Sequence, residues 1–261
     1  MKVALVDLEG TLIKGDSFIP GSTQLIEHLR ENNYKVLLLT NSTRFSTQQL
    51  HSKLLENKID IDECDIVDGA KMAAKQLKTD NHSTIYVLGC ASFVEELKSF
   101  GFEVITTKDH LNCKIEEIPL NPKVTAILVA EDFDFCFLHA SIGTRYVIEQ
   151  KCKFYCVGKD SQFPWNSDTI IPGPYTFATS IKVPSYVDPM IIGKPENVEL
   201  PINLKDYESI LVIGDSEHDI EYAKKIGAKS ALVMTGITET VKENLHPSIV
   251  LKDLFEATEK I

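Results

Sequence analysis

None of the hydrophobic runs in this 261-residue chain approaches the length of a membrane span. The apolar start, Val3 to Val6, is too short for a secretory signal peptide. The sequence also has no internal repeat and no low-complexity segment. We therefore expect a cytoplasmic protein with no membrane partner, folded as one large α/β domain or as two linked domains.

Basic side chains are scarce relative to acidic ones, since 27 lysines and arginines stand against 38 aspartates and glutamates. The formal net charge of −11 argues against a general affinity for nucleic acids or anionic membranes. We expect no nucleic-acid partner. An anionic substrate would have to be held by local cationic groups.

The cysteines lack the arrangement of a zinc site. Cys152 and Cys156 lie four residues apart on an expected strand, where they pack on one face, and no Cys-His pair lies nearby. We expect reduced thiols throughout, as in a cytoplasm. The six cysteines are Cys64, Cys90, Cys113, Cys136, Cys152 and Cys156.

Short apolar runs alternate with helical patterns along the chain, which indicates an α/β protein with parallel strands. The expected strands are Val3 to Val6, Lys35 to Thr40, Thr84 to Leu88, Glu103 to Thr106, Ala126 to Val129, Lys153 to Val157, Ile210 to Ile213, Ser230 to Met234 and Ile249 to Leu251. Helices are expected after Pro20-Gly21-Ser22, after a capping box of Ser46 and Gln49, over Ala70 to Leu77, near Ser92 to Ser99, over Phe135 to Glu149, before Gly227 and at the end of the chain. The proline-rich stretch from Gln162 to Pro189 is expected to be irregular.

The first expected strand ends abruptly in Asp7-Leu8-Glu9-Gly10-Thr11. Ligands of α/β proteins bind at the carboxyl ends of such strands, and a glycine there permits a tight turn with N–H groups facing an anion. Asp, Gly and Thr are also ordinary turn residues. These residues alone therefore leave open whether the strand ends at a ligand site or simply leaves for solvent.

Polar groups follow two further strands. Thr40-Asn41-Ser42-Thr43 offers hydroxyls, an amide and backbone N–H groups to phosphate oxygens, and it can equally cap the next helix. Asp215 and Asp219 can supply a carboxylate ligand for Mg²⁺ and a second carboxylate behind it, although Asp215 can also be a helix N-cap. His218 between them is expected to be a surface helix residue. Lys194, between Gly193 and Pro195, can be held toward a phosphate, whereas most lysines are simply solvated.

Taken in order, these segments resemble the four motifs of the haloacid dehalogenase (HAD) superfamily. The motifs are Asp7-x-Glu9-Gly10-Thr11, Leu39-Thr40-Asn41-Ser42, Gly193-Lys194-Pro195 and Gly214-Asp215-x-x-x-Asp219. Ile19-Pro20-Gly21, Thr40 to Arg44 and Thr235-Gly236-Ile237 resemble the class IIA branch, with its NagD-type and p-nitrophenylphosphatase-like enzymes. The resemblance implies a Rossmann-like core formed by residues 1–82 and 189–261, with an α/β cap of the C2 type, residues 83–188, inserted between them.

The resemblance also implies a role for each matching residue in phosphomonoester hydrolysis. Asp7 would be the nucleophile that forms an aspartyl-phosphate. Mg²⁺ would be held by the side chains of Asp7 and Asp215 and by the backbone carbonyl of Glu9. Asp219 would support this site from behind.

Three further positions would bind the substrate in this resemblance. Thr40, the backbone of Asn41 and Lys194 would hold the transferred phosphoryl oxygens. Asp160, in Gly158-Lys159-Asp160, occupies the place where relatives present a substrate-facing loop of the cap. We therefore predict that Asp160 contributes to specificity.

The sequence departs from the family pattern at two places. Glu9 stands where the family usually has the aspartate that protonates the leaving oxygen and then activates water, so its carboxyl reaches further by one methylene. Glutamate at this position also occurs in the enolase-phosphatase branch. His218 takes the place of one acidic residue of the fourth motif.

We predict a Mg²⁺-dependent phosphomonoesterase that acts on a small phosphorylated metabolite. Two alternatives are a phospholigand-binding protein that lost turnover through Glu9, and a phosphatase for phosphorylated protein side chains. A sizeable cap favours small molecules over the second alternative, because it would obstruct a macromolecule. The resemblance leaves a homodimer formed through the cap open.

Overall fold

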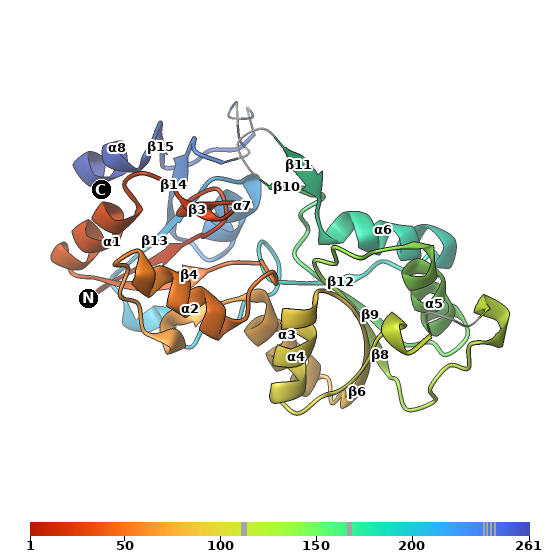
Figure 1. Ribbon diagram of the computed structural model, residues 1–261. Helices are drawn as coiled ribbons and strands as arrows, with labels where there is room; N and C mark the ends of the chain where they lie inside the picture. Colours follow the sequence, from red (N-terminus) through yellow and green to blue (C-terminus); the bar gives the residue numbers. More distant parts are fainter. Residues whose placement is uncertain (111–113, 166–168, 237, 239, 241, 243) are drawn as a thin grey trace.

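The computed structural model describes residues 1–110, 114–165, 169–236, 238, 240, 242 and 244–261 (Figure 1). Cys113 and Ile237, which the sequence analysis named, lie outside these residues. Cys64, Cys90, Cys136, Cys152 and Cys156 are free thiols, as predicted. Among the described residues, no helix has both the length and the apolar character needed to cross a membrane.

A six-stranded parallel sheet and its helices form the first unit, at the left of Figure 1, where both termini lie. Its strands run in the order β15-β14-β13-β1-β4-β5, with β1 near the centre. The strands are β1 (Lys2–Val6), β4 (Tyr34–Leu39), β5 (Ile66–Val67), β13 (Ser209–Gly214), β14 (Lys229–Val233) and β15 (Ile249–Leu251). The helices are α1 (Ser22–Glu31), α2 (Thr47–Glu56), α7 (Glu217–Lys225) and α8 (Leu254–Lys260), and α3 (Gly69–Thr79) lies between this unit and the second one.

A five-stranded parallel sheet forms the second unit, at the right of Figure 1, in the strand order β12-β9-β8-β6-β7. The strands are β6 (Thr84–Leu88), β7 (Glu103–Ile105), β8 (Ala126–Val129), β9 (Lys153–Val157) and β12 (Met190–Ile192). Its helices are α4 (Ala91–Ser99), α5 (Phe137–Ile148) and α6 (Pro174–Ser185). Strand β12 pairs with β9 of this sheet although it follows residue 189, the expected end of the inserted segment. The division at residue 189 stays a prediction.

Strand β1 is apolar on both faces because it lies inside the sheet with side chains packed above and below. Val3 and Leu5 belong to one buried apolar cluster, and Ala4 and Val6 belong to another. A near-continuous hydrophobic run is typical of such a doubly covered parallel strand. The first cluster continues through α3 into the second sheet, so the two units share a core.

The expectation of irregular structure from Gln162 to Pro189 was wrong. This stretch contains an antiparallel hairpin, β10 (Gln162–Pro164) with β11 (Ile170–Pro172), followed by helix α6. Pro174 is the first residue of α6, where a missing N–H costs nothing because that donor has no helical partner anyway. Pro184 lies in the last turn. Pro174 therefore stands where a helix tolerates proline, whereas Pro184 lies inside the helix and leaves it without one N–H donor near its end.

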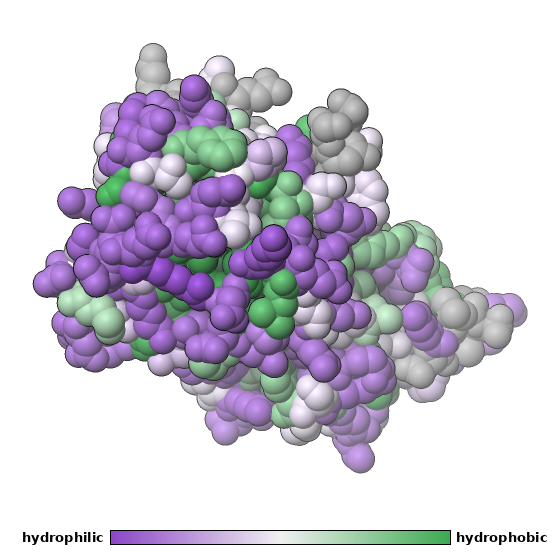
Figure 2. Space-filling view, turned by 60° about the vertical axis from the view of Figure 1, so that its left-hand side comes forward, coloured by the Kyte–Doolittle hydropathy of each residue, from purple (hydrophilic) through white to green (hydrophobic). Residues whose placement is uncertain are grey.

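A short hairpin follows the first strand, formed by β2 (Ile13–Lys14) and β3 (Ser17–Phe18). The capping box predicted at the start of α2 is present, since the Ser46 side chain accepts from the Gln49 N–H and the Gln49 side chain accepts from the Ser46 N–H. Figure 2 shows one face of the molecule, where hydrophilic side chains predominate and apolar patches are small.

Candidate functional site

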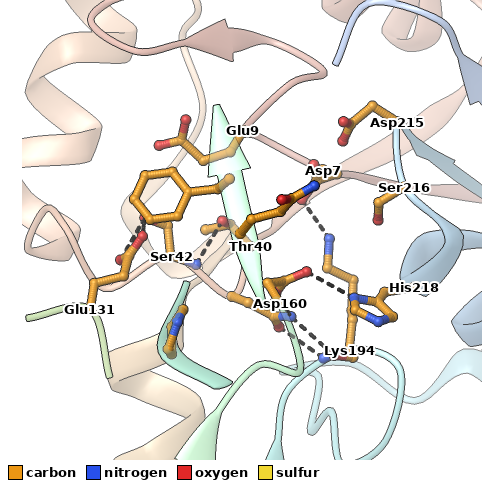
Figure 3. A pocket seen from close by; sticks show the side chains of 14 residues that line it. Asp7, Glu9, Thr40, Ser42, Glu131, Asp160, Lys194, Asp215, Ser216 and His218 are labelled. Carbon is orange, nitrogen blue, oxygen red and sulfur yellow. Dashed lines mark hydrogen bonds and ion pairs between the residues drawn. The ribbon is translucent and has the colours of Figure 1, made fainter. Parts of the chain in front are cut away.

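The carboxyl ends of the central strands of both sheets meet at one pocket with a cavity volume of about 70 Å³ (Figure 3). Strands β1, β4 and β13 of the first unit deliver polar residues to it, and the segments after β8 and β9 of the second unit close it. The lining residues are Asp7, Glu9, Thr40, Asn41, Ser42, Glu131, Asp160, Gln162, Phe163, Pro174, Lys194, Asp215, Ser216 and His218. Every predicted site residue except Asp219 lines this pocket, and Asp219 is buried beside it.

Lys194 is buried and its ammonium joins two carboxylates of the first unit. The Nζ atom lies 2.5 Å from Asp7 Oδ1 and 2.6 Å from Asp219 Oδ1. Burial alone would lower the pKa of Lys194, but Asp219 and Asp7 raise it, so the side chain is a cation. An ammonium has three donors, so one remains for a further acceptor in the pocket.

Asp7 is almost fully buried at the end of β1. Burial raises the pKa of Asp7 to about 7. The Lys194 ammonium lowers this pKa, and the Asp219 carboxylate raises it further. The second oxygen, Oδ2, accepts a hydrogen bond of 3.3 Å from the Thr11 hydroxyl. A carboxyl group in this surrounding needs further positive charge to be held ionised.

Carboxylate oxygens of Asp7, Asp215 and Asp219 lie within 4.8 Å of one another, and all three side chains are buried. Three hard oxygen donors at this spacing match the ligand preference of Mg²⁺. Two glycines make room for Asp215. A Cβ atom on Gly10 would lie 2.4 Å from Asp215 Oδ2, and one on Gly236 would lie 1.7 Å from it. The donor set therefore fits a small divalent cation.

Asp219 contacts Lys194 with one carboxylate oxygen and the start of α7 with the other. Its Oδ2 accepts from the Ser216 N–H at 3.1 Å and from the Ser216 hydroxyl at 2.6 Å, which completes a capping box. With both oxygens engaged, Asp219 fits the supporting role expected for it better than that of a direct metal ligand.

Glu9 lies in the tight turn after β1, and its two carboxyl oxygens are buried without a hydrogen-bond partner among the described residues. Burial raises the pKa of Glu9 to about 8, although the nearby Arg44 guanidinium opposes this rise. The turn is fixed because Gly10 N–H donates to Ile13 O and the Thr235 hydroxyl donates to Gly10 O, each at 2.7 Å. Burial therefore favours the protonated form of this carboxyl group.

Asn41 ties the end of β4 to the Lys194 segment. Its Oδ1 accepts from the Lys194 N–H at 2.8 Å, and its Nδ2 donates to the Lys194 carbonyl at 3.0 Å. Gly193 has a φ of +96°, and a Cβ there would lie 2.3 Å from Asn41 Oδ1, so the chain needs glycine before Lys194. Thr40 is buried next to Asn41.

His218 is not the surface helix residue that was expected. It is partly buried in the pocket wall, and its Nδ1 lies 2.8 Å from Asp160 Oδ1, across the boundary between the two units. Asp160 Oδ2 also accepts from Asn41 Nδ2 at 3.2 Å. Burial would lower the pKa of His218, but Asp160 raises it; His218 in turn keeps the pKa of Asp160 low despite burial. Each of the two side chains therefore favours the charged form of the other.

Glu131, which follows β8, is a pocket residue that the sequence analysis missed. It is buried, and burial raises its pKa even though Thr43 and Ser42 donate hydrogen bonds to it. The pattern that indicated Asp7, an acidic residue directly after a buried strand, was present here too, since Ala130-Glu131-Asp132 follows an expected strand. Sequence reasoning applied that signal only to the strands outside the inserted segment.

Two family profiles match the chain, one described as haloacid dehalogenase-like hydrolase over residues 4–103 and the other as HAD-hydrolase-like over residues 191–257. The chain belongs to the haloacid dehalogenase-like hydrolases, as its four motifs indicated. The residues between the two matches carry β8, β9, α5 and α6 of the second unit.

Named relatives span almost the whole chain. The sugar-phosphatase AraL of Bacillus subtilis is 28% identical over 262 residues, which cover 97% of this chain and 91% of that protein. A p-nitrophenyl phosphatase structure from Archaeoglobus fulgidus superposes with a TM-score of 0.79 at 20% identity, covering 99% and 98% of the two chains. A glycerol phosphate phosphatase from Mycobacterium tuberculosis in complex with magnesium gives a TM-score of 0.77 at 20% identity, covering 97% of this chain and 75% of that one.

Proposed function

We propose that this protein is a Mg²⁺-dependent phosphomonoesterase that hydrolyses a small phosphorylated metabolite. The observation that carries the proposal is the buried group of Asp7, Asp215 and Asp219 carboxylates, with the Lys194 ammonium bound between Asp7 and Asp219. This group combines a nucleophile, a fitting set of cation ligands and a fixed positive charge. The names of the relatives, which are phosphatases, support the same reaction.

The first step is in-line attack of an Asp7 carboxylate oxygen on the phosphorus of the ester. The bond from phosphorus to the ester oxygen breaks, and that oxygen takes the proton of Glu9 as the alcohol leaves. An aspartyl-phosphate remains on Asp7. Bound Mg²⁺, held by the Asp7 and Asp215 side chains and the Glu9 carbonyl, would offset the repulsion between carboxylate and phosphate.

The second step returns the enzyme to its starting state. Glu9, now ionised, accepts a proton from a water molecule whose oxygen attacks the phosphorus of the aspartyl-phosphate. The bond between phosphorus and Asp7 breaks, which releases inorganic phosphate and regenerates the carboxylate of Asp7 and the acid form of Glu9. The raised pKa of Glu9 suits both roles near neutral pH.

The transferred phosphoryl oxygens would be bound by Thr40, Asn41 and Lys194. Among the described residues, the backbone N–H of Asn41 has no acceptor. Lys194 has a third ammonium donor beyond its two carboxylate contacts. The Thr40 oxygen accepts from the Ser42 N–H at 3.0 Å, which leaves its own hydrogen for another acceptor. Such fixed donors supply much of the catalysis in phosphoryl transfer.

The second unit would act as the cap that chooses the alcohol part of the substrate. Asp160 and Glu131 reach the pocket from it, and the cavity of about 70 Å³ leaves room only for a small group unless the units separate. The direct contact of Asp160 with His218 and Asn41 supports its predicted part in specificity. The cytoplasmic location and a homodimer through the cap stay predictions.

A phosphate-release screen with and without Mg²⁺ tests the proposal. The panel would contain sugar phosphates, nucleotides, phosphoglycolate, pyridoxal phosphate and a phosphoserine peptide, with p-nitrophenyl phosphate as a generic ester. We expect Mg²⁺-dependent release from at least one sugar phosphate. Binding of the esters without release would favour the phospholigand-binding alternative, and release from the peptide alone would favour a protein substrate.

A further inference from the structure

We propose that Glu131 of the second unit is a positioning residue for the phosphate-binding loop of the first unit, Thr40 to Thr43. This inference rests on the proposed function, because it assigns Glu131 a part in the same reaction. It implies that the phosphate site is complete only when the second unit is docked on the first.

Among the described residues, the donors that bind the Glu131 carboxylate all belong to this loop. Its Oε2 accepts from the Thr43 N–H at 2.5 Å, from the Thr43 hydroxyl at 3.0 Å and from the Ser42 hydroxyl at 3.1 Å. The N–H of Glu131 itself donates to Thr43 Oγ1 at 3.1 Å. The contact therefore runs in both directions and fixes the Thr43 hydroxyl as donor and acceptor at once.

The contact continues to the proposed phosphoryl ligands. Ser42, whose hydroxyl binds Glu131, donates its N–H to the Thr40 oxygen at 3.0 Å. That bond uses a lone pair of the hydroxyl, so the Thr40 hydrogen has to point elsewhere, and Thr40 lines the pocket. Asn41 lies between the two, with its side chain fixed separately by Lys194. Glu131 thus sets the orientation of the donors on one side of the site.

The position of an acidic side chain beside a site for an anion also needs an explanation, and contact with the loop provides one. A carboxylate in the wall of a site for an anion would repel the substrate, and burial makes its own ionisation unfavourable. Here the loop surrounds it with N–H and O–H donors, and Arg44 lies near. The donors of the loop thus offset part of the cost of burying an acid at the edge of the phosphate site.

Glu96 of α4 gives a matched control, because it makes the same kind of contact away from the pocket. Its Oε1 accepts from the Thr47 N–H at 3.0 Å and from the Thr47 hydroxyl at 2.7 Å. It therefore also ties the second unit to the first through a threonine. Unlike Glu131, neither Glu96 nor Thr47 lines the pocket around Asp7.

The test compares Glu131→Ala with Glu96→Ala in the Mg²⁺-loaded protein, using p-nitrophenyl phosphate. We expect Glu131→Ala to lower kcat about 100-fold with a smaller change in KM, since a small displacement of positioning groups costs on the order of 10²-fold. Glu96→Ala should stay within about threefold of the wild type, in line with the small loss expected for a contact away from the reacting groups. Glu131→Gln should recover most of the activity, because its amide oxygen can take the place of Oε2.

Threonine variants check the same path from the other side. Thr43→Val should act like Glu131→Ala and add little to it in the double variant, whereas Thr43→Ser should stay near the wild type. Melting temperatures show whether each variant is folded. Equal losses in Glu131→Ala and Glu96→Ala, or wild-type turnover by Glu131→Ala, would overturn the inference and leave the proposed function standing.

Calorimetric titration with inorganic phosphate and Mg²⁺ separates the two claims if the wild type proves inactive. Tighter phosphate binding by the wild type than by Glu131→Ala would keep the inference while the proposed function fails. Equal binding, or no binding by either protein, would overturn the inference too.

Discussion

At the scale of single residues, Glu9 combines two properties that a proton-transfer group needs. Its carboxyl oxygens have no partner among the described residues, and burial raises its pKa to about 8. Its protonated form is therefore favoured, and the group is not committed to another hydrogen bond. The extra methylene relative to the usual aspartate leaves its carboxyl in the pocket wall.

Replacement of Glu9 by Gln should affect aryl and alkyl esters differently. An aryl phosphate leaves as a stable phenolate and hardly needs a proton, whereas a sugar phosphate leaves as a poor alkoxide. We expect the alkyl ester to be hydrolysed about 10²- to 10⁴-fold more slowly, the usual range for lost acid–base assistance. With p-nitrophenyl phosphate, rapid mixing should show a phenolate burst approaching one equivalent per site, followed by slow turnover.

One result with the same variant would contradict proton transfer by Glu9. If Glu9→Gln hydrolyses both kinds of ester at the wild-type rate, another group transfers the protons. Thermal unfolding of the variant serves as the control for folding.

At the scale of elements, the turn after β1 and the segment after β14 close on Asp215. Gly236→Ala would place a methyl group 1.7 Å from Asp215 Oδ2, so the carboxylate would have to move. We expect this variant to lose Mg²⁺ affinity, measured by calorimetry, and most phosphatase activity. Gly101→Ala is the control for an added methyl group away from the site, since its Cβ would meet nothing within 4 Å, although its φ of +95° should cost about 1–3 kcal/mol of stability. Normal Mg²⁺ affinity in Gly236→Ala would contradict the assignment of Asp215 as a ligand.

Elements with strong local signals were predictable from the sequence. The strand from Thr84 to Leu88 and the strand from Ala126 to Val129 have the predicted bounds, because apolar runs between polar residues define buried strands. Helix α6 was missed because sequence reasoning counted its prolines without asking where in a helix they would fall. Pro174 opens the helix and Pro184 lies in its last turn.

The candidate site was predictable where one short motif supplies the residue. Asp7, Thr40 and Asp215 line one pocket, as their positions at strand ends indicated, and Lys194 of the Gly193-Lys194-Pro195 motif lines it too. His218 was misjudged because its partner lies 58 residues away, on the other unit. Contacts of this kind depend on how the two units pack, and local patterns contain no information about that packing.

At the scale of the whole molecule, the pocket brings several acidic side chains together, which should repel one another unless a cation is bound. Mg²⁺ should therefore raise the melting temperature as well as activate the enzyme. Calcium should bind but support the reaction poorly, because its larger and more flexible coordination would align nucleophile and phosphate less well. Differential scanning fluorimetry and phosphate release with each ion measure both effects. Full activity after exhaustive chelation would rule out this role for the metal.

Covalent catalysis by Asp7 can be tested directly. The intact protein is needed because the second unit closes the pocket over this residue. Glu9→Gln would be mixed with Mg²⁺ and p-nitrophenyl phosphate, quenched in acid and digested for mass spectrometry, with Asp7→Asn as the folded control that cannot form an aspartyl-phosphate. The proposed reaction predicts one phosphoryl group on the peptide that contains Asp7, none on Asp7→Asn, and no turnover by Asp7→Asn. Substantial phosphatase activity in Asp7→Asn, or a phosphoryl group on another residue, would contradict it.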